Sequence, residues 1–352
     1  MIDPTLSHLS DLAFEGAMAG YLVALVCHAL LMASSHVRKQ APAAAAVSAA
    51  VSVPAFVAAG GAPMTADTLS DRGSAADSAP VGAAVPPAPG AEQRHTRFAE
   101  QIGRAAVIVT AIGFACHVLA LVLRGFAAHR PPWGNMYEFT LMITGAAVAT
   151  WLVVLWRNRF ARPMGIYVMT PITVLVFLAG TVLYTRSAPV VPILNTYWLN
   201  VHVVAISLSS GVLMLSGLAS AAYLGRLRYD ARVAAGAIDP ARSATRLPEA
   251  AKLDRIAYRA AIAGFPFYTF AIIAGALWAE VAWGSYWSWD PKEVVALASW
   301  VVYAGYLHAR ATAGWRGKPA AWISIVGLAT IIFNLFFVNM VISGMHSYAG
   351  LN

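Results

Sequence analysis

Two long stretches of the chain contain no Asp, Glu, Lys or Arg. One covers residues 187–225 and the other covers residues 319–352. Each is longer than the roughly 20 apolar residues that cross a bilayer as a helix. Of the 352 residues, 59% are hydrophobic and 11% are charged, whereas soluble domains carry about a quarter charged residues. The chain is therefore predicted to be an integral membrane protein, and a purely soluble fold is excluded.

The apolar segments predict an all-α fold, a polytopic membrane helix bundle with about eight transmembrane helices. The first segment is too long and too weakly basic at its start for a typical signal peptide, since no Lys or Arg precedes Arg38. We therefore expect it to stay as a membrane span. The expected spans are residues 12–34, 104–123, 138–156, 164–184, 197–224, 259–279, 294–309 and 320–341.

The basic residues predict the orientation of these spans. When the sides are numbered alternately, four of the 24 Lys and Arg residues fall on one side and the rest fall on the other. Because cytoplasmic loops are enriched in Lys and Arg, the side with few basic residues is predicted to be outside, together with the N-terminus and the C-terminus. The net charge of +8 is interpreted as this bias, and no nucleic-acid partner is expected. The four outer basic residues are Arg124, Arg130, Arg186 and Lys292.

Composition divides the chain into three parts. Residues 1–37 hold the first transmembrane helix with a short outer N-terminus, and residues 104–352 hold the remaining spans. Between them, residues 38–103 are rich in Ala, Ser and Pro and poor in large aliphatic and aromatic side chains. Such a segment cannot bury a core, so we expect a disordered inner linker. A further membrane-associated stretch near residues 42–62 is the alternative.

Two histidines far apart in the sequence are predicted to meet at the outer face. His202 lies near the outer end of the fifth span, and His346 lies just beyond the outer end of the last span. An imidazole next to an apolar span either bonds to a neighbouring helix or has a function. Two that converge can ligate opposite faces of a metal centre, and imidazole is a common axial ligand of haem iron. His308 is expected at the inner end of the seventh span, roughly 21 Å of helix from the outer end of that span. It therefore cannot bind the same metal centre as His202 and His346.

A tryptophan-rich connector joins the sixth and seventh spans on the same outer side. Its sequence is WGSYWSWDPKE, residues 283–293. The structural interpretation is an aromatic belt at the level of the lipid headgroups. Three indoles around one glycine also suit a flat apolar ligand, with the flanking charges at its polar edge. The residues concerned are Trp283, Gly284, Trp287, Trp289 and Asp290.

These motifs together resemble a known family. The connector is similar to the WWD signature of haem-handling membrane proteins. WLNVHVV, the connector, WVVYAGYLHAR and FNLFFVNMVISGMHSYAG are similar, in order and spacing, to the CcsA (ResC)-type subunit of System II cytochrome c synthases. PPWGNMYEF, residues 131–139, also matches that pattern, and the resemblance covers roughly residues 104–352. It implies a bacterial plasma-membrane protein for haem export and for covalent attachment of haem to the C-x-x-C-H motif of apocytochrome c, on the outer (periplasmic) face.

The resemblance also implies residue roles and partners. His202 and His346 match the axial ligands of haem iron at an outer site, and His308 matches the iron ligand of a site within the membrane. Haem b is the expected ligand and substrate, and the chain would contribute only haem positioning to catalysis. The implied partners are a CcsB (ResB)-type membrane protein, apocytochrome c and thiol-reducing proteins. The residues that match the WWD platform are Trp283, Gly284, Trp287, Trp289 and Asp290.

Three questions stay open at the level of sequence. The second ligand of the membrane site comes from the CcsB-type partner or from His28 of the first span. The polar cluster of Asn135, Tyr137 and Glu138 either binds haem propionates or the partner, or caps the third span. The rival functions are a haem transporter or chaperone without ligase activity, and a non-haem membrane transporter.

Overall fold

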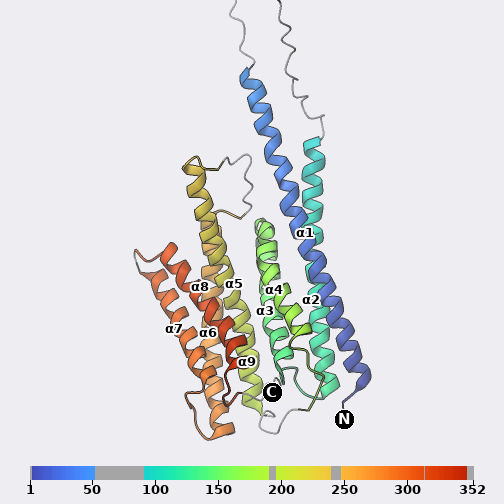
Figure 1. The fold of residues 1–352 in the computed structure, drawn as a ribbon, viewed down its shortest axis with the longest axis vertical. Helices are drawn as coiled ribbons and strands as arrows, with labels where there is room; N and C mark the ends of the chain where they lie inside the picture. Colours follow the sequence, from blue (N-terminus) through green and yellow to red (C-terminus); the bar gives the residue numbers. More distant parts are fainter. Residues whose placement is uncertain (1, 52–90, 190–195, 239–246, 313, 347–352) are drawn as a thin grey trace, which may run out of the picture.

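The regular secondary structure of the described residues is all helical (Figure 1). The computed structural model describes residues 2–51, 91–189, 196–238, 247–312 and 314–346. Two irregular helical turns interrupt the bundle, the 3-10 turn η1 (Arg159–Met164) and the π-helical turn η3 (Asn334–Val338). The α-helices are α1 (Pro4–Val51), α2 (Ala91–Ala128), α3 (Met136–Arg157), α4 (Gly165–Thr181), α5 (Tyr197–Ala234), α6 (Ala250–Trp283), α7 (Pro291–Ala311), α8 (Lys318–Phe333) and the short α9 (Asn339–Val341).

The expected membrane helix bundle is confirmed. Seven segments of the described residues are helical, long and apolar enough to cross a membrane. The helix α7 is not among these segments, although its 21 residues are nearly as many as the 22 of α3. The eighth span therefore stays a prediction. Large apolar side chains such as Phe267 and Val281 are more than half exposed, as on surfaces that face lipid.

The expected linker at residues 38–103 is covered only at its ends. The helix α1 extends to Val51 and α2 begins at Ala91, so helix occupies both flanks. Residues 52–90 lie outside the described residues. The disordered linker, and the alternative of a membrane-associated stretch near residues 42–62, stay predictions.

The N-terminus and α9 lie at the same end of the bundle (Figure 1). An even number of helices that alternate in direction, such as α1 to α8, brings the chain back to the end at which it began. The side of the membrane that this end faces stays a prediction, based on the positions of the basic residues.

The bundle has two halves, which meet where α3 packs against α5. In one half α1 packs along α2, and in the other α5 packs along α6 and α7 packs along α8 (Figure 1). Small residues allow the backbones to approach closely. A Cβ added at Gly20 would lie 2.8 Å from Cα of Gly113, and one added at Gly211 would lie 2.7 Å from the carbonyl oxygen of Ile143. Such contacts through small residues are typical of membrane helices.

A buried ion network fixes the start of α3. The carboxylate of Glu138 is fully buried and accepts hydrogen bonds from Arg124 Nε at 2.8 Å and from Arg130 Nη1 at 2.7 Å. Asn135 caps the helix, because its Oδ1 accepts a hydrogen bond from the backbone N–H of Glu138 at 2.9 Å. Two arginines thus compensate the charge of Glu138. These contacts support the capping interpretation of the polar cluster.

Candidate functional site

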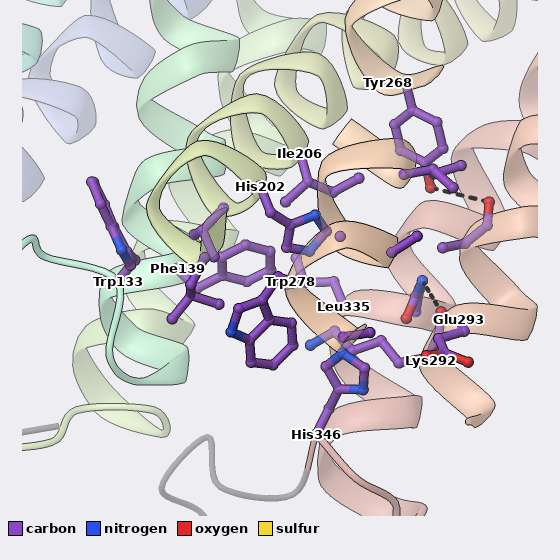
Figure 2. Close-up of a pocket in the computed structure, with 18 of the residues that line it drawn as sticks. Trp133, Phe139, His202, Ile206, Tyr268, Trp278, Lys292, Glu293, Leu335 and His346 are labelled. Carbon is purple, nitrogen blue, oxygen red and sulfur yellow. Dashed lines mark hydrogen bonds between the residues drawn. The ribbon is translucent and has the colours of Figure 1, made fainter. Parts of the chain in front are cut away.

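An apolar pocket lies at the end of the bundle where α6 connects to α7 (Figure 2). Its walls come from the start of α3, from α5, α6, α7 and α8, from η3, and from the segment after α9. The empty space is about 1300 Å³, including its open mouth. Aromatic and aliphatic side chains form most of the wall, with a few polar groups, as in sites for organic ligands. The residues that matter below are His202, Trp278, Trp283, Trp287, Lys292 and His346.

The imidazole of His202 enters the pocket from α5. Its Nδ1 lies 2.8 Å from the backbone carbonyl oxygen of Ala271 on α6. Because a carbonyl only accepts hydrogen bonds, Nδ1 carries the proton and Nε2 keeps its lone pair. Gly275 makes room for the ring, since a Cβ there would lie 2.7 Å from two of its atoms. The sequence of α6 therefore holds this histidine in one tautomer and one position.

The imidazole of His346 enters the pocket from the opposite part of the chain, after α9. Its Nδ1 lies 2.8 Å from Oδ1 of Asp290, and its ring lies 5.0 Å from that of Trp283 and 5.9 Å from that of Trp278, between centroids. Burial lowers the pKa of His346, although the hydrogen bond to Asp290 opposes this shift. At neutral pH the ring is uncharged and donates from Nδ1, so its Nε2 is the nitrogen suited to bind a metal. Figure 2 shows His202 and His346 around the same pocket.

Asp290 links the tryptophan-rich connector to this second histidine. Its carboxylate caps α7 by accepting the N–H of Lys292 at 3.0 Å, and it also accepts the N–H of Met345 at 2.6 Å. Burial alone would raise the pKa of Asp290, but the hydrogen bond from His346 and the two backbone donors lower it below its ordinary value. Asp290 is 5% exposed and does not line the pocket. It acts on the site through His346.

The connector residues do not all face the pocket. Trp283, which ends α6, and Trp287 both line it. Gly284 caps α6 in the left-handed region at φ 73°, which favours glycine. Trp289 is 74% exposed, and its ring packs edge to face on Trp287 with centroids 5.7 Å apart. Of the five platform residues expected from the sequence, the structure brings two to the pocket and places Gly284, Trp289 and Asp290 around it.

Among the wall residues that were not assigned to the site from the sequence, two tryptophans and one lysine matter most for its chemistry. Trp278 is 1% exposed, and its ring centroid lies 4.7 Å from that of Trp283. It sits inside an apolar span, where no signal marks it. Trp133 and Lys292 also line the pocket. Both lie in sequence motifs that resemble the family, Trp133 in PPWGNMYEF and Lys292 in the connector. Their place in these motifs was the signal that could have identified them.

His308 lies away from this pocket. It is exposed near the end of α7, and its Nε2 is 3.5 Å from Oγ1 of Thr312. About 26 Å of helix separates it from Pro291, so the separation of the two regions along α7 is as expected.

The pairing of His28 with His308 inside this chain is wrong. His28 is 2% exposed and packs against Gly165 of α4. The helix α1 packs on α2 and α4, whereas α7 packs on α6 and α8 (Figure 1). The two histidines therefore lie on opposite sides of the bundle.

Comparisons with known proteins show the family of the chain. A family model described as "Cytochrome C assembly protein" matches residues 133–346, which is more than half of the chain. "Cytochrome c biogenesis protein CcsA" of Parasynechococcus marenigrum (strain WH8102) is 35% identical over 249 residues, covering 65% of this chain and 81% of that protein. The protein of the same name from Gloeothece citriformis (strain PCC 7424) is 34% identical over 311 residues, covering 76% and 91%.

The fold and the pocket define a multi-pass helical membrane protein with an aromatic pocket that contains two histidines. The matched region includes both histidines and the whole connector. The chain belongs to the cytochrome c assembly protein family, and the resemblance to CcsA-type proteins based on its motifs is confirmed.

Proposed function

We propose that this chain binds haem in the pocket and serves as the WWD subunit of a System II cytochrome c synthase. One observation carries the proposal. His202 and His346 come from distant segments, line one aromatic pocket, and each has its Nδ1 engaged by an acceptor from another segment. Because Nδ1 carries the proton in each ring, the Nε2 nitrogens are the proposed iron ligands, while a porphyrin supplies the other four.

The pocket fits haem in its chemistry as well as its ligands. Trp278, Trp283 and Trp287 offer flat apolar surface to a flat apolar macrocycle. Asp290 provides the carboxylate that commonly orients a metal-binding imidazole and raises its basicity. Haem is here the substrate that the protein holds and passes on.

The reaction proposed at this site is the addition of two substrate thiols to the two vinyl groups of haem. In each addition the sulfur bonds to one vinyl carbon and the thiol proton ends on the other, so no oxidant is consumed. The chain's own cysteines, Cys27 and Cys116, form no CxxC pair, and the C-x-x-C-H motif of apocytochrome c supplies the thiols. Holding haem and substrate in register is the contribution of the enzyme. Thiol-reducing proteins keep the substrate cysteines reduced, and the histidine of the motif replaces one axial ligand as the product leaves.

The route to the pocket is proposed to begin at the other end of α7. The exposed position of His308 suits an iron ligand that is shared with a second protein, and a CcsB (ResB)-type partner would supply the opposite ligand. Haem then moves from the inner side of a bacterial plasma membrane to the outer pocket. The excess of Lys and Arg in the loops at the His308 end of the bundle supports the assignment of that end to the inner side.

Co-expression with an apocytochrome tests the synthase activity. The full chain and a CcsB-type partner are produced with an apocytochrome in cells that lack other maturation factors. Covalently attached haem in the cytochrome is the expected result. If haem copurifies with the chain but no cytochrome carries attached haem, the protein delivers haem without ligating it. If the purified chain shows no haem absorbance, the non-haem transporter is the better assignment.

A further inference from the structure

Lys292 brings a positive charge into the apolar pocket. It is the second residue of α7, and its side chain lines the pocket together with both histidines (Figure 2). Its ammonium donates a hydrogen bond to Oδ1 of Asn339 at 2.5 Å and lies 5.4 Å from the ring centroid of Phe139. An ammonium has three donors, and Asn339 accepts from one of them. The charged end of this residue therefore belongs to the wall that a ligand touches.

No carboxylate of the described residues lies within 4.0 Å of this ammonium. The two acidic residues next to it in sequence are engaged elsewhere. Asp290 holds His346, and Glu293 accepts hydrogen bonds from the N–H and the hydroxyl of Ser288 at 3.0 and 3.2 Å. The charge of Asp290 attracts this ammonium without making an ion pair with it, and a charge next to apolar surface without a contacting counter-ion is costly. An anionic group on the ligand would remove that cost.

Asn339 aims its carbonyl at Lys292 because its amide is already used. Its Nδ2 donates to the carbonyl oxygens of Asn334 and Leu335, at 3.0 and 2.7 Å, where η3 opens the helical ladder. The Nδ2 of Asn334 in turn donates to the carbonyl oxygen of Lys292 at 3.2 Å. These bonds form a polar corner in an otherwise apolar wall. A purely structural corner would need a donor at Lys292 but not its charge.

We infer that Lys292 binds a carboxylate of the ligand, and that the pocket is specific for a macrocycle that carries one. This inference rests on the proposed function, since haem carries two propionates on one part of its edge and its vinyl groups elsewhere. A propionate on Lys292 fixes the rotation of the ring about the axis between His202 and His346. Lys292 is therefore a specificity-determining residue, which presents the vinyl groups in one orientation to the incoming thiols.

Binding of haem and of its dimethyl ester tests the inference without any turnover. Both compounds share the iron, ring and vinyl groups, and only haem has free carboxylates. The full chain is purified in detergent and titrated with each compound, with absorbance as the readout. The wild type is expected to bind haem about tenfold or more tightly than the ester. Lys292→Gln is expected to bind haem about tenfold more weakly and to bind the ester as the wild type does.

Two further variants separate charge from folding. Lys292→Arg keeps the charge and is expected to keep the preference for haem over the ester. Lys252→Gln removes a lysine that lies 3.4 Å from Glu249 at the start of α6, outside the pocket, and is expected to change neither affinity. Melting temperatures show which variants are folded well enough to compare.

The outcomes distinguish this inference from the proposed function. A wild type that binds neither compound contradicts both. A wild type that binds haem while Lys292→Gln keeps the same ratio of haem to ester affinity overturns the inference alone, as does a wild type without any preference.

Discussion

The two ends of α7 present histidine in opposite ways. At its start, Asp290 holds His346 in a buried aromatic pocket, and His202 faces the same pocket with its own fixed partner. Near its other end, His308 is exposed, and within the described residues the hydrogen bond of its ring is a 3.5 Å contact to Thr312, which caps the same helix. One helix thus carries a preorganised ligand region and an open one.

This difference separates two functions that a haem-handling protein needs. A site that holds its ligand during a reaction benefits from imidazoles fixed in orientation by hydrogen bonds from neighbouring segments. A site that passes its ligand on needs a single, accessible ligand to which a second protein can add another. The pocket is therefore proposed as the place of chemistry, and the region of His308 as a place of transfer.

Removal of both pocket ligands is expected to have the largest effect. The double variant His202→Ala/His346→Ala should lose haem absorbance after purification and should lower the yield of mature cytochrome by about a hundredfold or more, since even outer partners of metal ligands are worth 10–100-fold. Added imidazole should partly restore the spectrum of each single variant. His8→Ala, an exposed histidine of α1, is the matched control. Retention of the wild-type spectrum in the double variant would show that other residues bind the iron.

His308→Ala is expected to separate the two regions. In cells, the yield of mature cytochrome should fall roughly tenfold, because haem is proposed to reach the pocket through this residue. In the purified protein, haem added directly should bind the pocket with an affinity within about twofold of the wild type, since distant sites without shared partners act independently. Titration of the purified variant beside the assay in cells checks both statements. An equal loss in both would place His308 and the pocket in one site.

Gly275→Ala tests how tightly the pocket holds His202. The new Cβ would lie 2.7 Å from ring atoms of His202, so the ring must move, at a cost of about 1–3 kcal/mol in the free energy of unfolding. Haem affinity is expected to fall about tenfold. Gly305→Ala on α7 is the matched control, because a Cβ there meets nothing within 4 Å and alanine favours helix. Equal losses in both variants would point to a general effect on the bundle.

The sequence predicted the fold and the meeting of His202 with His346 because both follow from counting the apolar spans along the chain. Apolar length marks each span, and the alternation of sides then places any residue near a span end on one face or the other. The same count could not exclude a pair of His28 and His308. That question depends on which helices are neighbours, and the packing of α1 on α2 and α4 decides it.

The contacts inside the pocket could not be predicted in this way. The partner of His202 is a backbone carbonyl at Ala271, which has no side-chain signature. Asp290 was assigned to the platform because it follows the tryptophans, yet its carboxylate faces a residue 56 positions later in the chain. Trp278 looks like any aromatic residue of an apolar span. Each of these depends on the registration of helices against one another, which hydropathy does not report.

Asp290→Asn is expected to have the smallest effect on binding and the most specific effect on the iron. The amide oxygen can still accept the Nδ1–H of His346, but the negative charge that makes this imidazole a stronger donor to iron is lost. The reduction potential of bound haem should therefore rise, by about 60 mV for a tenfold change in the ratio of reduced to oxidised haem. A potentiometric titration followed by absorbance measures it. Since the amide NH₂ also faces the N–H of Met345, the melting temperature is recorded alongside.

Glu293→Gln is the matched control for that shift. Glu293 belongs to the same capping box at the start of α7, but its hydrogen-bond donors are Ser288 and the N–H of Asp290, the latter at 3.2 Å. Its replacement removes an equal charge from the same helix end, so a general electrostatic effect would move both potentials alike. A rise in Asp290→Asn alone assigns the shift to the bond between Asp290 and His346. Equal shifts would mean that Asp290 acts only as a nearby charge. His202 and His346 would then differ little in strength as iron ligands, despite the different hydrogen-bond partners of their Nδ1 atoms.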